Sequence, residues 1–461
     1  MFINIRTILS KMQDHNLTTG NIQNLVRKIA IPASIGFFFH TMYNVVDTYF
    51  AGLISTTALA ALSVSFPVFF IIIALSSGVG TGATALIAHA LGGKDNLKAK
   101  HYAAQAATFS VLVGIGVTIV GLLISPFLFR LLGAEGEYLQ IALDYMNIIF
   151  YGSVFFILIQ IGNAILNAAG DTKTLRNYMI AGFFLNVILD PWFLYGGFGI
   201  PAMGVKGIAL ATVVVQIIGT MYVGYKVVKV GFISREFWHH LVPHRKVVTE
   251  LIRQGLPASL NMMTIAIGIF VITYFVNFFG TQAVAAYGIA TRIEQIALLP
   301  SIGLNIATLA LVGQNMGAKK YSRIKETLKT VLWDGFLLIL VGYGLVFAFA
   351  RQLMGFFTQD AAVIAVGVEY LRIATFISFA YVITFTHISA LQGMKKPSFA
   401  LWIGIYRQIV GPLAVFYLVT RVFGLGLPGI WWGIFAVTWS AALVTFWYTR
   451  RVVRTIGDSV K

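Results

Sequence analysis

Apolar stretches long enough to cross a lipid bilayer recur along the entire chain, and they limit the possible folds more than any other feature. A helix needs about 20 predominantly apolar residues to span the hydrocarbon core, where backbone polar groups must be satisfied within the chain. We therefore predict an all-α polytopic membrane protein with twelve transmembrane helices. The expected spans are 25–50, 57–83, 102–124, 138–163, 174–196, 205–228, 252–279, 283–311, 328–350, 363–390, 398–420 and 429–449.

The distribution of charge predicts the orientation of the chain in the membrane. With both termini in the cytoplasm, the inner segments contain 26 of the 33 Lys and Arg residues, as the positive-inside rule requires. The net charge of +17 then indicates contact with anionic lipid of the inner leaflet and not with nucleic acid. We expect a multi-pass protein of a prokaryotic cytoplasmic (inner) membrane.

Several classes of function are disfavoured by what the sequence contains. It has no cysteine, which excludes disulfides, thiolate metal sites and a cysteine nucleophile. The glycine-rich stretch SSGVGTGATAL lacks the lysine of a phosphate loop and lies within an expected span, so close helix packing explains it better. No catalytic signature is found. We expect a protein that is not an enzyme and that needs no cofactor.

The two halves of the chain resemble each other. IPAS at Ile31–Ser34 returns as LPAS at Leu256–Ser259, and LDY at Leu143–Tyr145 matches VEY at Val368–Tyr370, both at an offset of 225 residues. Each half has six spans that start inside, which predicts two parallel six-helix repeats. The expected divisions are a cytoplasmic N-terminal segment (1–24), an N-lobe (25–228), a cytoplasmic linker (229–251), a C-lobe (252–450) and a cytoplasmic tail (451–461).

Two aspartates lie within spans of the first half, where a charged side chain near the bilayer centre costs ~2.5–3.5 kcal/mol. Asp47 lies in HTMYNVVDTYF and Asp190 in NVILDPWF. Helix rise places both roughly 25–28 Å above the inner boundary of their spans, so we expect them at similar depth. The repeat aligns Asp47 with Ile272 and Asp190 with Pro412, so the second half lacks both carboxylates. We interpret the pair as functional; the alternative is that each aspartate only caps backbone groups or bonds Asn and Thr neighbours.

Polar neighbours extend the aspartate pair into a predicted cluster. Asn186 lies one turn before Asp190, and Thr212 lies about 12 Å below the outer end of its own span. Two carboxylates in a low-dielectric site raise each other's affinity for protons, so the site can carry protons near neutral pH. Its carboxylate, amide and hydroxyl oxygens also suit Na⁺. The coupling ion is therefore H⁺ or Na⁺, with Asp47, Asn186, Asp190 and Thr212 as its ligands.

Other polar residues in the spans allow two interpretations each. His40, Tyr43 and Asn44 share a helix face with Asp47, although His40 is also typical of a histidine that only packs between helices. Arg292 and Glu294 are two residues apart and do not share a face, so we expect each to pair with another helix in a structural role.

Several motifs together resemble the multidrug and toxic compound extrusion (MATE) family, in particular its DinF-like branch. They are VVDTYFAG, GDTKT, NVILDPWF followed by GVKGIALAT, and GIATRIEQI, and the similarity covers essentially all twelve spans. The resemblance implies two six-helix lobes around a V-shaped central cavity. It also implies export of cationic or amphipathic drugs in exchange for H⁺ or Na⁺. The residues that it implies for ion coupling are Asp47, Asn186, Asp190 and Thr212.

The resemblance also implies roles in substrate binding and gating. Tyr43 and Asn163 match positions that line the pocket of the first lobe, and we add Asn44 and Met179 to the expected substrate contacts. Pro32 should bend or break the first span, because it removes a backbone donor and crowds the preceding turn. In this family, bending of the first helix is linked to protonation. Pro257 occupies the repeated position, so the proline can also be purely architectural.

Two features separate this chain from alternatives. The NorM-like branch carries acids in the second lobe, whereas this chain has Ile265 at the matching place and Glu369 only at the start of span 10. The main alternative function is a flippase for lipids or lipid-linked oligosaccharides, which Arg372 and Arg407 would serve by binding an anionic cargo. A channel or receptor explains the acid pair less well. We expect a monomer in the bilayer that binds small-molecule drugs and no nucleic acid.

Overall fold

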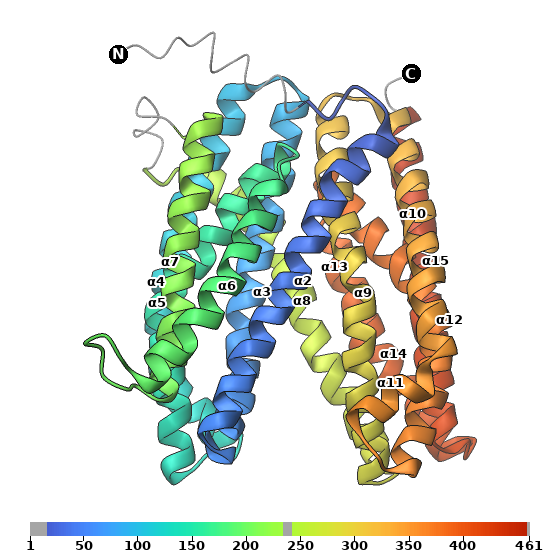
Figure 1. Ribbon diagram of the computed structural model, residues 1–461. Coiled ribbons are helices and arrows are strands. Elements are labelled where there is room, and N and C mark those ends of the chain that lie inside the picture. The colour runs from blue at the N-terminus through green and yellow to red at the C-terminus, as the bar shows by residue number, and fades with distance from the viewer. Residues whose placement is uncertain (1–15, 234–241, 459–461) are drawn as a thin grey trace. The chain divides into compact units, whose positions relative to one another are not determined.

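The chain is helical throughout the part that the structure describes. The computed structural model describes residues 16–233 and 242–458 (Figure 1). Twelve helices in these ranges are long and apolar enough to cross a membrane. The predicted fold class, an all-α protein with twelve transmembrane helices, is confirmed. Part of the expected linker 229–251 and most of the N-terminal segment 1–24 lie outside the described residues.

Most helices are longer than the apolar spans because polar turns extend them at their ends. At the start of α4, for example, the side chain of Asp95 accepts a hydrogen bond from the Lys98 amide and caps the helix. The helices of the first half are α2 (Ile22–Ile54), α3 (Thr56–Gly92), α4 (Asn96–Leu131), α5 (Gly136–Ala168), α6 (Lys173–Tyr195) and α7 (Val205–Val230). The second half contains α8 (Arg245–Asn277), α9 (Thr281–Gly317), α10 (Tyr321–Ala348), α11 (Ala350–Phe357), α12 (Ala361–Gly393) and α15 (Gly426–Asp458).

The eleventh span is irregular. It consists of α13 (Ser398–Ile405), the π-helical turn η2 (Tyr406–Val410), α14 (Gly411–Tyr417) and a second π-helical turn η3 (Leu418–Val422). π-Helical turns within α-helices are rare and often mark functional positions. A single apolar span therefore carries two local changes of helical register.

The chain divides into two compact units, and the divisions fall within helices. Unit 1 includes Ile35–Ser259, and unit 2 includes Leu17–Ser34 and Leu260–Lys461. The first part of α2 therefore belongs to unit 2 and the rest to unit 1, while α8 is divided in the opposite sense. Within unit 1, α5 packs against α3, α4 and α7; within unit 2, α12 packs against α9, α10 and α15.

Hydrogen bonds attach the first part of α2 within unit 2. The amide Nε2 of Gln23 lies 2.8 Å from both carboxylate oxygens of Asp334, and the Ser34 hydroxyl donates to the Pro300 carbonyl over 3.1 Å. Pro32 lies inside this helix, which continues without interruption. The first span is therefore not broken at Pro32, while the bend expected there stays a prediction. A proline removes only one backbone donor, and neighbouring groups in a membrane helix bundle compensate for that loss.

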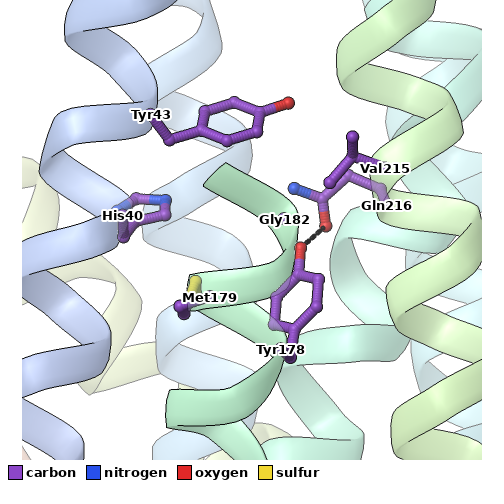
Figure 2. Close-up of a pocket in the computed structure, with 7 residues that line it drawn as sticks. All are labelled: His40, Tyr43, Tyr178, Met179, Gly182, Val215 and Gln216. Atoms are coloured by element: carbon purple, nitrogen blue, oxygen red, sulfur yellow. Dashed lines mark hydrogen bonds between the residues drawn. The ribbon is translucent and has the colours of Figure 1, made fainter. Parts of the chain in front are cut away.

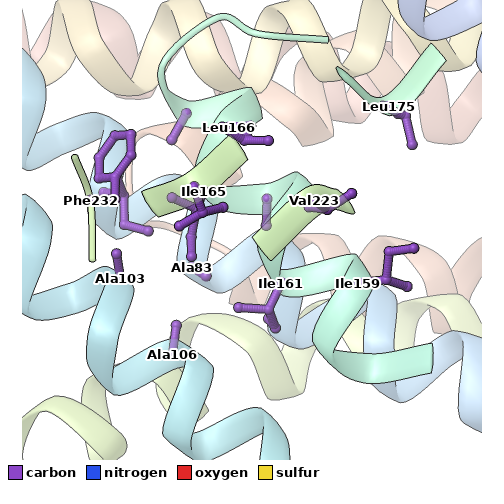
Figure 3. Packing of buried hydrophobic residues seen from close by; sticks show 14 of the residues in the cluster. Ala83, Ala103, Ala106, Ile159, Ile161, Ile165, Leu166, Leu175, Val223 and Phe232 are labelled. Carbon is purple, nitrogen blue, oxygen red and sulfur yellow. The ribbon is translucent and has the colours of Figure 1, made fainter. Parts of the chain in front are cut away.

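Small residues allow the helices of unit 1 to approach closely. Ala83, Ala103 and Ala106 are completely buried in a cluster with larger aliphatic residues, and Figure 3 shows this packing. At Gly82 the approach reaches the backbone, because an added Cβ would lie 2.8 Å from the amide nitrogen of Gly255. Membrane helices lack a hydrophobic force between them and depend on such close contacts.

The substitution Gly82→Ala should destabilise unit 1 by about 1–3 kcal/mol, because the new methyl group would overlap backbone atoms that cannot rotate away. Thermal unfolding of the purified protein in detergent measures this effect. Gly116→Ala is the matched control, since a Cβ there meets nothing within 4 Å. Equal melting temperatures for both variants would show that the contact between α3 and α8 tolerates a side chain.

Candidate functional site

Three helices of unit 1 bring the predicted ion-coupling residues together. The Nδ2 amide of Asn186 on α6 donates to Asp47 Oδ1 on α2 and to Asp190 Oδ1, each over 2.9 Å. The hydroxyl of Thr212 on α7 lies 3.3 Å from Asp47 Oδ2. Since both carboxylates accept from one nitrogen, their oxygens are no more than about 6 Å apart. The expected proximity of Asp47 and Asp190 is therefore confirmed.

Burial makes ionised carboxylates in this cluster energetically unfavourable unless a partner neutralises them. Asp190 and Asn186 are completely buried, and Thr212 and Asp47 are almost so. Asn186 Oδ1 and Asp190 Oδ2 are buried and have no hydrogen-bond partner among the described residues. Buried acceptors of this kind need a hydrogen-bond donor or a cation, because leaving them unsatisfied is costly. The residues present therefore fit either H⁺ or a hard cation such as Na⁺ held by oxygen ligands.

A small pocket opens on the same three helices (Figure 2). It is lined by residues that lie mostly about one helical turn from the acid cluster, namely His40 and Tyr43 of α2, Tyr178, Met179 and Gly182 of α6, and Val215 and Gln216 of α7. Tyr43 precedes Asp47 by four residues, and Gln216 follows Thr212 by four. One turn is about 5.4 Å, so the pocket and the acid cluster are neighbours.

The residues predicted to contact the substrate divide into two groups. Tyr43 and Met179 line the pocket. Asn44 is exposed on α2, where its amide donates to the His40 carbonyl, and Asn163 is buried on α5 with both side-chain polar atoms unpartnered among the described residues. Substrate contact by these four side chains stays a prediction.

The sequence did not indicate three further residues of this region. The Tyr178 hydroxyl donates to Gln216 Oε1 over 2.9 Å and closes one side of the pocket, as Figure 2 shows. Tyr145 of α5 is buried and interacts electrostatically with Asp47 and Asp190. A signal for Tyr145 was present in the repeated LDY and VEY motifs, which mark its position in both halves. Nothing in the sequence distinguishes Tyr178 or Gln216 from other residues of their spans.

The arginines considered for an anionic cargo stack on aromatic rings of unit 2. Arg372 is exposed, with its guanidinium 5.6 Å from the centre of the Phe347 ring. Arg407 is buried, with Tyr381 and Phe385 at 5.2 and 5.1 Å. Each guanidinium group is thus stabilised in part by a cation–π contact.

The substitution Asn186→Leu should destabilise the protein by about 2–4 kcal/mol at neutral pH, because it removes the donor shared by two buried carboxylates. The loss should be smaller at acidic pH, where protonated carboxyls no longer repel each other. Thermal unfolding in detergent at both pH values measures this difference. Asn44→Leu is the matched control, because Asn44 is exposed and donates only to the His40 carbonyl in the described structure. A loss independent of pH would mean that Asn186 acts through packing alone.

Comparison with known proteins identifies relatives along most of the chain. The MatE family model matches residues 32–192 and 257–418. A probable multidrug resistance protein, YoeA of Bacillus subtilis, is 27% identical over 402 residues, which are 86% of each chain. The probable multidrug resistance protein NorM of Thermotoga maritima is 28% identical, over 89% of this chain and 88% of its own. A solved MATE transporter of the MOP superfamily in an outward-facing conformation matches with a TM-score of 0.88 and 27% identity, over 96% of this chain and 98% of its own.

Proposed function

Because the chain belongs to the MatE family of multidrug efflux transporters, we propose that it exports cationic or amphipathic compounds in exchange for H⁺ or Na⁺. Relatives named as multidrug resistance or export proteins support the substrate class. The observation that carries the proposed coupling is the buried cluster of Asp47, Asn186 and Asp190 with its two unpartnered acceptor atoms.

The proposed coupling follows from the charge of this cluster. When both aspartates are ionised, two negative charges share one neutral amide donor in a region with little solvent, and a cation is strongly favoured there. A proton or Na⁺ neutralises the charge directly. A cationic drug in the pocket one turn away reduces it electrostatically. Both occupants are favoured by the same negative charge, so binding of one weakens binding of the other, as antiport requires.

We also propose the position of the protein in the cell. The excess of Lys and Arg in alternate connecting segments supports a multi-pass arrangement with both termini in the cytoplasm. The bacterial relatives support a prokaryotic cytoplasmic membrane. We propose that the transporter works as a monomer, because one chain contains both the acid cluster and the pocket.

The substitutions Asp47→Asn and Asp190→Asn should each reduce drug extrusion to the level of cells without the transporter, because each keeps the shape of the side chain and removes its titratable charge. Drug resistance and dye efflux in cells that contain equal amounts of membrane-inserted protein measure this effect.

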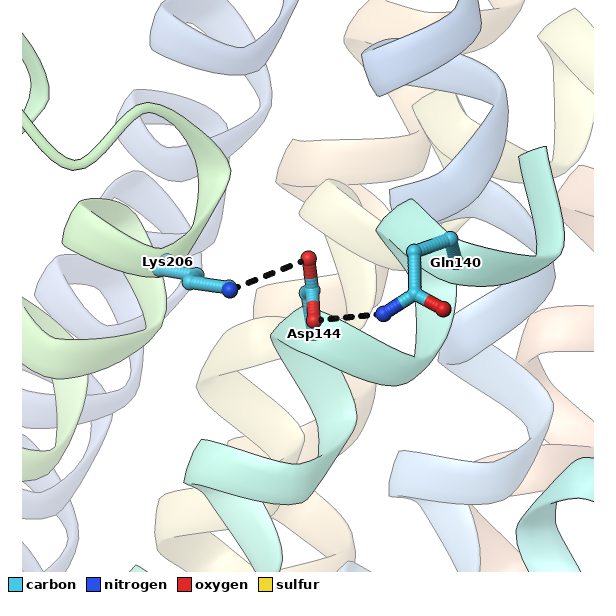
Figure 4. A network of polar contacts seen from close by, with 3 residues as sticks. All are labelled: Gln140, Asp144 and Lys206. Atoms are coloured by element: carbon cyan, nitrogen blue, oxygen red, sulfur yellow. Dashed lines mark hydrogen bonds and ion pairs between the residues drawn. The ribbon is translucent and has the colours of Figure 1, made fainter. Parts of the chain in front are cut away.

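Asp144→Asn is the matched control for these variants. Asp144 also lies in unit 1, but it is partly exposed and forms an ion pair with Lys206 over 3.3 Å and a hydrogen bond with Gln140 (Figure 4). Exposed ion pairs contribute about 0–1 kcal/mol, so efflux should stay close to wild type. Retained resistance with Asp47→Asn or Asp190→Asn would contradict the proposed coupling.

Lipophilic cations should be exported at least about tenfold faster than anions of similar size, because an interaction difference of about 1.4 kcal/mol with a negative site already gives this factor. Proteoliposomes with a proton gradient or a Na⁺ gradient imposed separately measure both selectivity and the coupling ion. Transport of neither class under either gradient, together with tight binding of pyrophosphate-bearing lipids, would instead indicate a flippase.

A further inference from the structure

A buried carboxylate in unit 2 takes no part in the proposed coupling. Glu294 of α9 is only 6% exposed. Its Oε2 accepts a hydrogen bond from the Tyr370 hydroxyl of α12 over 2.9 Å, while its Oε1 is buried and has no partner among the described residues. The Tyr343 hydroxyl of α10 donates to the Glu294 backbone carbonyl over 3.2 Å and does not bond the carboxyl group. One neutral donor thus serves the whole carboxyl group.

The carboxyl group of Glu294 interacts with a cationic side chain, Arg407 of η2, without an ion pair among the described residues. The guanidinium of Arg407 stacks instead on Tyr381 and Phe385. Arg407 lies in a π-helical turn, a local change of register of the kind often found at functional positions.

The surroundings of Glu294 favour a neutral acid over a carboxylate. The titratable groups that face it are Tyr343 from α10, Tyr370 and Tyr381 from α12, Arg407 from η2 and Tyr287 from α9 itself. The Trp431 ring of α15, which is completely buried, stacks on Tyr287 and meets Tyr370 edge to face. An ionised carboxylate within aromatic rings, with a single neutral donor, is poorly stabilised.

The internal repeat gives independent support. Tyr370 and Tyr145 occupy equivalent positions at the offset of 225 residues. Tyr145 interacts with Asp47 and Asp190 in unit 1, and Tyr370 bonds Glu294 in unit 2. The acids themselves are not equivalent, because the position equivalent to Glu294 in the first half is Phe69. Each unit therefore places a buried acid beside the same tyrosine position, from a different helix.

We propose that Glu294 is a second proton-binding site, in unit 2, which carries its proton on Oε1 in the described structure. When the proton leaves to water, Arg407 moves from its aromatic stack and pairs with the carboxylate. The site is a property of unit 2 alone, and only the use of its proton in drug exchange rests on the proposed function.

Difference infrared spectroscopy of the full chain in lipid tests this proposal, because it detects the C=O stretch of a protonated carboxyl group. A band that appears as the pH is lowered should be absent from Glu294→Gln and present in the Asp47→Asn, Asp190→Asn double variant. An unchanged set of bands in Glu294→Gln would overturn the proposal.

If Glu294→Gln fails to fold, two variants that retain Glu294, Tyr370→Phe and Tyr343→Phe, still test the proposal. With the proton on Oε1, Oε2 is the carbonyl oxygen, so Tyr370→Phe should move the band to higher wavenumber by removing its hydrogen bond. Tyr343→Phe is the matched control and should leave the band in place. An unmoved band in Tyr370→Phe would contradict the assignment of the proton.

A separate experiment tests the role of Arg407. Arg407→Gln removes the counter-charge of the ionised carboxylate, so the protonated band should persist at pH values where the wild type has lost it. Arg372→Gln, at an exposed arginine stacked on Phe347, is the control and should titrate as the wild type does. Identical titrations of both variants would overturn the proposed pairing. Drug efflux by Asp47→Asn, by contrast, tests the proposed function and leaves this spectroscopic result unaffected.

Discussion

The burial of two carboxylates against one amide donor is the interaction on which the rest of unit 1 depends. Asp47 and Asp190 come from helices that are far apart in the chain, and Asn186 joins them with both hydrogens of its amide group. That arrangement satisfies two of the four carboxylate oxygens, and Thr212 approaches a third. The last oxygen, Asp190 Oδ2, has no partner in the described structure. A buried cluster with more acceptors than donors suits the proton or cation binding that we propose for it.

The pocket lies close to the acid cluster, as the proposed exchange of an ion for a drug requires. Pocket and cluster share α2, α6 and α7 and are separated by about one helical turn, a distance over which charges interact strongly where water is scarce. Tyr43 belongs to the pocket and lies one turn before Asp47 on the same face of α2. A ligand against Tyr43 and a proton on Asp47 therefore influence each other through space, and no long pathway is needed. Helix α2 also continues from unit 2 into unit 1. Its first part bonds Asp334 through Gln23, and its later part carries Asp47.

Helix geometry explains what the sequence could and could not predict. The depth of Asp47 and Asp190 follows from residue counts and helix rise, so their proximity could be predicted once both were assigned to one lobe. Side-chain direction depends on the rotation of each helix, which the packing of its neighbours determines. For that reason the sequence did not show that Tyr43 would be buried and line the pocket while the next residue, Asn44, would be exposed. Of the two effects predicted for Pro32, a bend or a break, the break does not occur, because the sequence does not show which neighbours support the backbone around a proline.

The internal repeat also shows that a sequence comparison cannot predict a site built from several helices. Sequence alignment of the halves showed that neither Asp47 nor Asp190 has a counterpart in the second half, and Glu294 was expected to have only a structural role. Alignment compares positions along one helix, whereas a buried site is built from several helices that approach one point. Glu294 reaches the tyrosine of its unit from α9, although Asp47 lies on α2 and Asp190 on α6. A duplicated backbone thus repeats the place where a tyrosine interacts with a buried acid, and it leaves open which helix supplies that acid. Functional symmetry between the halves must therefore be sought in the spatial neighbours of repeated residues such as Tyr145 and Tyr370.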